Sequence, residues 1–118
     1  MEKKIAITVT TLNALESNID QRFGRSPAFL ILNSDGEIVE GITNPSVDSG
    51  HGAGTGSSAL MAEMGVTDII SGTFGPKAFS ALDTMNIAMW TIEDGYTAKE
   101  AFQKFNSGQL TQMTIQKF

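Results

Sequence analysis

The single histidine of this chain, His51, lies in a glycine-rich stretch, "NPSVDSGHGAGTGSSALMAEMG", which runs from Asn44 to Gly65. Glycines occupy alternate positions around it, at Gly50, Gly52, Gly54 and Gly56. Because these neighbours carry no side chains, the imidazole is open to a bulky ligand. Imidazole is a good ligand for borderline-soft metals. One histidine cannot build a metal cage from protein alone, but it can ligate an open corner of a preassembled cluster.

A second group that could act in binding is the pair Arg22 and Arg25, in the segment "DQRFGRSP" from Asp20 to Pro27. Guanidinium groups are permanently charged donors, so they can balance the charge of an anionic ligand. Alternatively, the two arginines are ordinary solvated side chains near Asp20 or Glu16.

The composition fits one soluble domain covering residues 1–118. The chain has a net charge of −5 and no cysteine. The acidic balance disfavours binding to nucleic acid or to acidic membranes. The absence of cysteine excludes disulfides and thiolate-ligated metal sites. With neither a signal peptide nor a membrane-spanning run expected, we expect a cytoplasmic protein.

The elements that must position these side chains follow from periodicity and capping signals. Short apolar, β-branched segments predict strands, and Pro76 and the capping box "TAKE" predict the starts of two helices. A further helix is expected to start at Ser57 or Ser58 and to end at Gly65. The predicted strands span 4–10, 28–33, 37–43, 66–72 and 87–92, and 112–116 is either a last short strand or a tail.

This order predicts a three-layer α/β/α domain with a mixed sheet. If the hairpin of the second and third strands lies beside the first strand, the loops after strands one, three and four meet at one edge of the sheet. Ligands usually bind at this edge of α/β sheets. The residues expected to line one cleft there are Arg22, Phe23, Arg25, His51 and Thr73, with the helix starts at Ser57 and Pro76.

Several other functions lack their motifs. The glycine spacing does not fit G-x-G-x-x-G, and no lysine follows it as in a P-loop. The first strand, "IAITVTT", has no carboxylate of the kind that two-metal nucleases place there. Serines near His51 lack the G-x-S-x-G elbow of hydrolases. A plain strand-to-helix linker is an open alternative for the glycine stretch.

The sequence resembles the dinitrogenase iron–molybdenum cofactor biosynthesis family, also called nitrogenase accessory factor-like domains. Three segments, in their order along the chain, carry the resemblance. They are "RFGRSPAFLI", then "NP" with the glycine loop, then "GVTDIISGTFGPKAFSAL". The resemblance covers about residues 5–108. It implies a ribonuclease H-like motif fold with a five-stranded sheet of order 3-2-1-4-5 and an antiparallel second strand.

The resemblance also implies a function, namely the non-catalytic binding or carriage of an iron–molybdenum cofactor or a related iron–sulfur cluster. Partners would then be proteins that donate and accept the cluster. Some relatives carry cysteines near the histidine; here ligation would fall on His51 alone as the metal ligand. The implied cofactor-binding residues are Arg22, Phe23, Gly24, Arg25, Gly50, His51, Gly52, Gly54 and Thr73.

Two rival classes remain. A small-anion or nucleotide-binding regulatory domain could use the same loop and the free N–H groups of the helix starts. An interaction module without a ligand would instead show an apolar surface patch.

Overall fold

A computed structural model of the chain describes residues 3–44 and 53–113, with side chains in the second range from residue 56 onward. The strands are β1 (Lys4–Val9), β2 (Ala28–Asn33), β3 (Ile38–Thr43), β4 (Asp68–Ser71), β5 (Ala88–Thr91) and β6 (Thr111–Gln112). The helices are α1 (Ala53–Glu63), α2 (Pro76–Thr84) and α3 (Ala98–Asn106).

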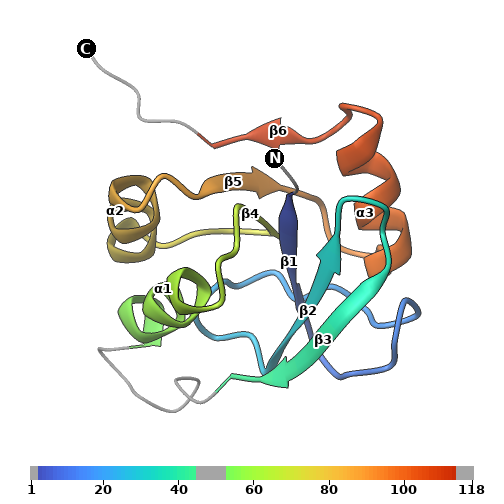
Figure 1. Ribbon diagram of the computed structural model, residues 1–118, viewed down its shortest axis with the longest axis horizontal. Coiled ribbons are helices and arrows are strands. Elements are labelled where there is room, and N and C mark those ends of the chain that lie inside the picture. The colour runs from blue at the N-terminus through green and yellow to red at the C-terminus, as the bar shows by residue number, and fades with distance from the viewer. Residues whose placement is uncertain (1–2, 45–52, 114–118) are drawn as a thin grey trace.

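The described strands form one mixed sheet in the order β3-β2-β1-β4-β5-β6 (Figure 1). Strand β1 pairs antiparallel with β2 and parallel with β4, and β4 pairs parallel with β5. The α/β class, the strand order and the antiparallel second strand are therefore confirmed. The predicted strand count of five was one too low, because Thr111 and Gln112 pair antiparallel with Thr91 and Trp90 to add β6.

Helices cover both faces of the sheet, so the three-layer arrangement is also confirmed. Helices α1 and α2 lie together on one face, and α3 lies on the other (Figure 1). Successive residues of β1 and β2 point to opposite faces of the sheet and so pack into two separate hydrophobic cores. Ala6 and Ile31 face α1 and α2, whereas Ile7 and Leu32 face α3.

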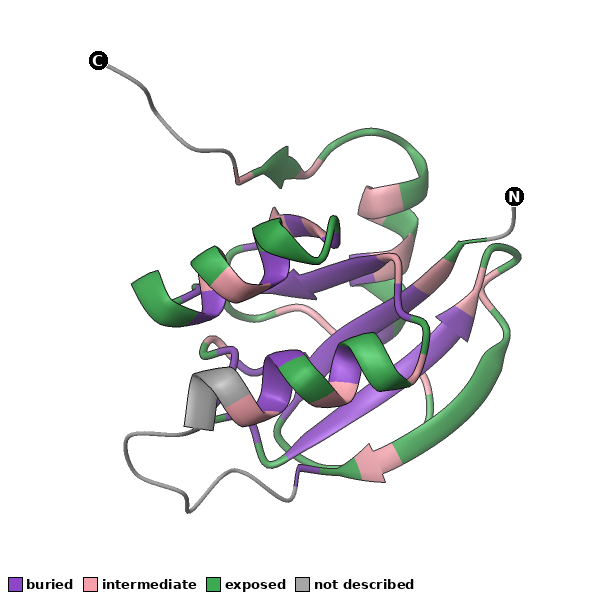
Figure 2. Cartoon of the chain, turned by 60° about the vertical axis from the view of Figure 1, so that its left-hand side comes forward, coloured by how far each residue is buried: buried purple, intermediate pink, exposed green. Residues whose placement is uncertain are grey.

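The central strands are buried on both sides, and β3 is not. Every residue of β1 from Ile5 to Val9 is buried, whereas β3 is exposed along almost its whole length (Figure 2). The register of β3 on β2 shifts between Ile31 and Leu32. Strand β3 is therefore an irregular edge strand of the sheet.

The ends of the helices mostly follow their sequence signals. Pro76 is the first residue of α2, where its missing N–H costs nothing. Gly65 follows α1 with a φ of 73°, a left-handed conformation that favours glycine. In α3, Thr97 and Glu100 form the predicted capping box. No helix in the described part of the chain has the length and apolar character needed to cross a membrane.

The predicted start of α1 was wrong. The helix begins at Ala53, inside the glycine-rich stretch, so Ser57 and Ser58 lie within it and do not cap it. Both serines are completely buried. The helix therefore forms despite the low helix propensity of its glycines, with small buried side chains on its inner face.

We expect Thr97→Ala to lower the free energy of unfolding by about 1 kcal/mol, because the Glu100 backbone N–H loses its acceptor. Urea denaturation followed by the fluorescence of Trp90, the single tryptophan, measures this. The matched control is Thr84→Ala, since the Thr84 hydroxyl only bonds back to the Ser80 carbonyl within α2. Equal losses in the two variants would contradict a specific capping role for Thr97.

Candidate functional site

The loop that follows β1 is attached to the sheet by a buried hydroxyl. Thr8 Oγ1 donates to the Asp20 carbonyl oxygen at 2.7 Å, and the Asp20 N–H donates back to the Thr8 carbonyl at 2.8 Å. The same Oγ1 lies 2.9 Å from Ser71 Oγ at the end of β4. Because a hydroxyl has a single proton, Thr8 accepts in this second bond. One side chain thereby fixes both the β1 loop and the end of β4.

Beyond Asp20, the β1 loop pairs with the loop after β4. The Thr73 N–H donates to the Gln21 carbonyl at 2.6 Å, and Thr73 Oγ1 donates to the same oxygen at 2.8 Å. The Phe23 N–H donates to the Thr73 carbonyl at 3.0 Å. These bonds form a short parallel bridge between Arg22 and Thr73. Sequence analysis placed these two loops at one edge, and the structure joins them directly.

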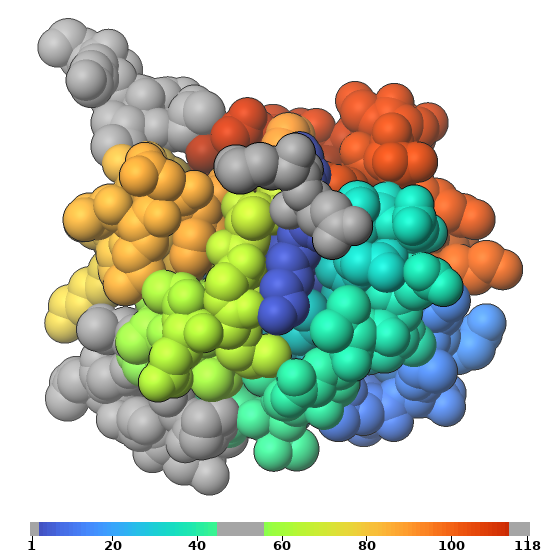
Figure 3. Space-filling model, in the orientation of Figure 1, coloured from blue at the N-terminus to red at the C-terminus, as the bar shows by residue number. Residues whose placement is uncertain are grey.

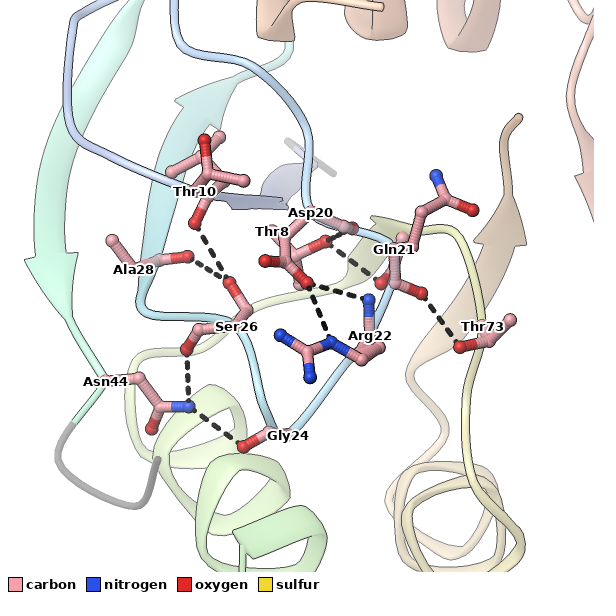
Figure 4. A network of polar contacts seen from close by, with 12 residues as sticks. Thr8, Thr10, Asp20, Gln21, Arg22, Gly24, Ser26, Ala28, Asn44 and Thr73 are labelled. Carbon is pink, nitrogen blue, oxygen red and sulfur yellow. Dashed lines mark hydrogen bonds and ion pairs between the residues drawn. The ribbon is translucent and has the colours of Figure 1, made fainter. Parts of the chain in front are cut away.

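The Arg22 side chain is exposed at this edge but is partly oriented by an acid. Asp20 Oδ1 accepts from the Arg22 backbone N–H at 2.9 Å and lies 3.7 Å from Arg22 Nε (Figure 4). The Asp20 side chain is only 8% exposed and that of Arg22 is 64% exposed. The buried carboxylate therefore contacts both the backbone N–H and the Nε of an arginine whose side chain is largely exposed. Arg25 is exposed on the same loop.

Phe23 and Gly24 have structural roles within the β1 loop. The Phe23 ring is buried and packs against Phe74 at 5.4 Å and Phe29 at 5.9 Å between ring centroids. Its predicted place in the lining of the cleft is therefore corrected, because the ring anchors the loop in the core. Gly24 has a φ of 94°, which a residue with a side chain rarely adopts. Its carbonyl is turned toward Asn44.

Asn44, the residue after β3, joins a third chain segment to this edge. Its Nδ2 donates to the carbonyl oxygens of Gly24 at 3.2 Å and Ser26 at 3.0 Å (Figure 4). Its Oδ1 accepts from Ser57 Oγ of α1 at 3.3 Å. Asn44 is buried, so each of these bonds satisfies a group that has little access to water. The amide thereby ties β3, the β1 loop and α1 together.

Apart from Phe23 and Gly24, the predicted site residues fall into three groups. Arg22, Arg25 and Thr73 are exposed on neighbouring loops, as predicted. Gly54 lies in the first turn of α1 instead of a loop, as a result of the early start of that helix. The predictions for Gly50, His51 and Gly52 lie outside the described residues.

Sequence reasoning missed two contributors to this edge. Asn44 entered only as part of the pair "NP", although an asparagine at the end of a strand is a frequent backbone-bonding residue. Gln21 carries no motif at all. Within the described residues, no group of three or more histidine, aspartate or glutamate side chains is placed to hold a metal ion.

The fold and this edge together define a three-layer α/β/α domain that brings the loops after β1, β3 and β4 to one side. The sequence profile of the family described as dinitrogenase iron-molybdenum cofactor matches residues 3–108. The chain belongs to that family, and the resemblance found in its sequence is confirmed.

Three relatives illustrate the match. An uncharacterized protein of Methanocaldococcus jannaschii, MJ0580, is 34% identical over 91% of this chain and 92% of its own length. The apo form of the orange protein of Desulfovibrio gigas is 30% identical, with a TM-score of 0.87 over 94% of this chain and 92% of that one. A Thermotoga protein named as a NifB candidate is 27% identical, with a TM-score of 0.82 over 98% of this chain and 97% of its own.

We expect Asn44→Ala to lower the free energy of unfolding by about 2 kcal/mol or more, because it leaves two buried carbonyls and a serine hydroxyl without this partner. Chemical denaturation provides the measurement. Asn106→Ala, at the exposed end of α3, is the control and should change stability by less than about 0.5 kcal/mol. Equal stability of the Asn44 variant and the wild type would show that this amide does not hold the edge together.

Proposed function

We propose that this protein binds and carries an iron–molybdenum cofactor or a related iron–sulfur cluster at the edge formed by the loops after β1, β3 and β4. The cluster is the cargo of the protein, and the proposed role is non-catalytic. The observation that carries the proposal is the placement of exposed Arg22 on a loop that is bonded to both the β4 loop and, through Asn44, the end of β3. The family to which the chain belongs supports the choice of cargo.

The charge and rigidity of the loop suit a large anionic ligand. Metal–sulfur clusters of this kind carry negative charge, and guanidinium groups offer several N–H donors in a fixed plane. Among the described residues, the contact seen for the Arg22 side chain is the one between its Nε and Asp20, which leaves its terminal nitrogens to the proposed cluster. Because the loop backbone is fixed by Thr8 and Thr73, little order has to be gained on binding.

We assign ligation of the cluster to His51, with the neighbouring glycines giving close access. His51 lies two residues before Ala53, the first residue of α1, and seven after Asn44. Both Asn44 and α1 belong to this edge, and Asn44 is bonded to Ser57 of α1. The start of α1 also contributes backbone N–H groups that a helix cannot pair internally, and such groups favour an anion. The orange protein, a relative of 30% identity, was solved in an apo form, a term for a protein without its ligand.

The direct test is anaerobic titration of the purified protein with isolated iron–molybdenum cofactor and, separately, with a [4Fe–4S] cluster. We expect the wild type to take up cluster with charge-transfer absorbance and His51→Ala to lose stoichiometric uptake, because its imidazole is the proposed ligand. Unchanged uptake by His51→Ala would remove the histidine from the site.

No uptake by either protein would contradict carriage altogether. The rival function, a small-anion or nucleotide-binding regulatory domain, would then be favoured if phosphate or ATP raised the melting temperature of both wild type and His51→Ala. A colourless ligand that stabilises the protein without His51 separates this rival from cluster carriage.

Charge balance at the edge gives a second prediction. We expect Arg22→Gln to weaken cluster binding by about threefold to tenfold, the effect of losing one charge-assisted contact. The control Lys99→Gln removes the same charge from the exposed side of α3 and should leave the affinity unchanged. Both affinities are measured by the same anaerobic titration at two salt concentrations. Equal weakening in the two variants would mean that only net charge matters.

A further inference from the structure

Two acidic side chains are buried in the described part of the chain, Asp68 and Asp20, and their surroundings differ. Asp68, at the start of β4, accepts a hydrogen bond from Trp90 Nε1 at 3.0 Å and lies 3.8 Å from Lys3 Nζ. Asp20 instead lies beside Arg22, at the edge where an anionic cargo is proposed. A buried acid at this position calls for an explanation, because its charge repels the anion that the arginine attracts.

The contacts of Asp20 fix its carboxylate close to the Arg22 side chain. Thr8 bonds to both backbone groups of Asp20, at 2.7 Å and 2.8 Å. Asp20 Oδ1 accepts from the Arg22 N–H at 2.9 Å and lies 3.7 Å from Arg22 Nε (Figure 4). The Asp20 side chain is only 8% exposed, so little water surrounds the carboxylate. Its charge is therefore weakly screened and acts on whatever binds at Arg22.

The loop does not need this negative charge for its own structure. An amide oxygen in the same place would accept the bond from the Arg22 N–H equally well. The ion pair with Nε is long, and an arginine side chain that is 64% exposed gains little from one such contact. The carboxyl group of Asp20 therefore matters more for its charge than for the stability of the loop.

We propose that Asp20 limits the affinity of this edge for its anionic cargo, so that the cargo can be released to an acceptor. Arg22 attracts the anion, and the Asp20 carboxylate beside it repels the same anion. The repulsion increases with the charge of the ligand, whereas the restraint that Asp20 places on Arg22 does not. For a multiply charged cluster the repulsion is the larger effect. This inference deepens the proposed function and rests on it for the identity of the cargo.

The first test is the anaerobic cluster titration with Asp20→Asn. We expect this variant to bind the cluster about threefold to tenfold more tightly than the wild type, chiefly through slower release. The gain should shrink at high salt, because screening weakens the repulsion. The matched control is Asp83→Asn, which removes the same charge from an exposed position in the last turn of α2. Weaker binding by Asp20→Asn, or an equal gain in Asp83→Asn, would overturn the proposal.

A second test uses colourless anions and no cluster. The chain has two arginines, Arg22 and Arg25, so Arg22→Lys assigns their Nε–H signals in a ¹H–¹⁵N NMR spectrum. We expect pyrophosphate to shift the Arg22 signal saturably and to bind Asp20→Asn about threefold more tightly than the wild type. Sulfate, which carries less charge, should show a smaller gain. Equal affinities of the two proteins for pyrophosphate, or no shift in either, would contradict a role of Asp20 in anion affinity.

The two tests separate this inference from cluster carriage. If neither protein takes up cluster and Asp20→Asn still binds pyrophosphate more tightly, carriage fails and the role of Asp20 stands. If both take up cluster with equal affinity, carriage stands and the role of Asp20 fails. Asp20→Ser provides a second variant in case Asp20→Asn folds poorly. It also lacks the charge, and its hydroxyl can accept from the Arg22 N–H, so it should show the same gain.

Discussion

The edge on which function is proposed depends on the Thr8 hydroxyl, buried in the central strand. A side chain in the middle of a sheet usually packs against apolar neighbours, and the other residues of β1 from Ile5 to Val9 are apolar. Thr8 instead makes two buried hydrogen bonds, one to the backbone of the β1 loop and one to the end of β4. Thr8 thus links the buried sheet to the polar edge. The Arg22–Thr73 bridge lies two residues further along both segments, beyond Asp20 and Ser71.

One short segment, Gln21–Arg22, separates two kinds of surface. On one side of the Gln21–Arg22 segment lies the edge that also receives Asn44 and α1, with α1 and α2 packed together over that face (Figure 3). On the other side lies a hollow toward α3, with Tyr96 and Lys104 in its lining. Backbone hydrogen bonds hold the segment in place. The side chains of Gln21 and Arg22 are therefore not needed to fix it. This is the usual division of labour in α/β domains, in which a rigid sheet presents variable loops.

The sequence predicted the architecture better than it predicted the site, for physical reasons. Strand pattern, Pro76 and the Thr97–Glu100 capping box are local signals, and each appears in the structure as expected. The start of α1 was misjudged because glycine and serine read as loop residues, while burial against the sheet favours the helix. Phe23 and Asn44 were misjudged or overlooked because their roles depend on contacts with residues far away in the chain. No local rule reports that a ring is buried or that an amide bridges three segments.

The irregular edge of the sheet has a consequence for how this protein behaves when concentrated. An open edge strand is a template for pairing with other chains. Strand β3 is exposed, but its register shift interrupts regular pairing, and Glu40 places a charge along it. At the opposite edge, the described part of the chain places two residues in β6, Thr111 and Gln112. The register shift and the charge on β3 and the shortness of β6 are features that disfavour strand addition, and they offset the exposed apolar side chains of Ile38 and Val39 on β3.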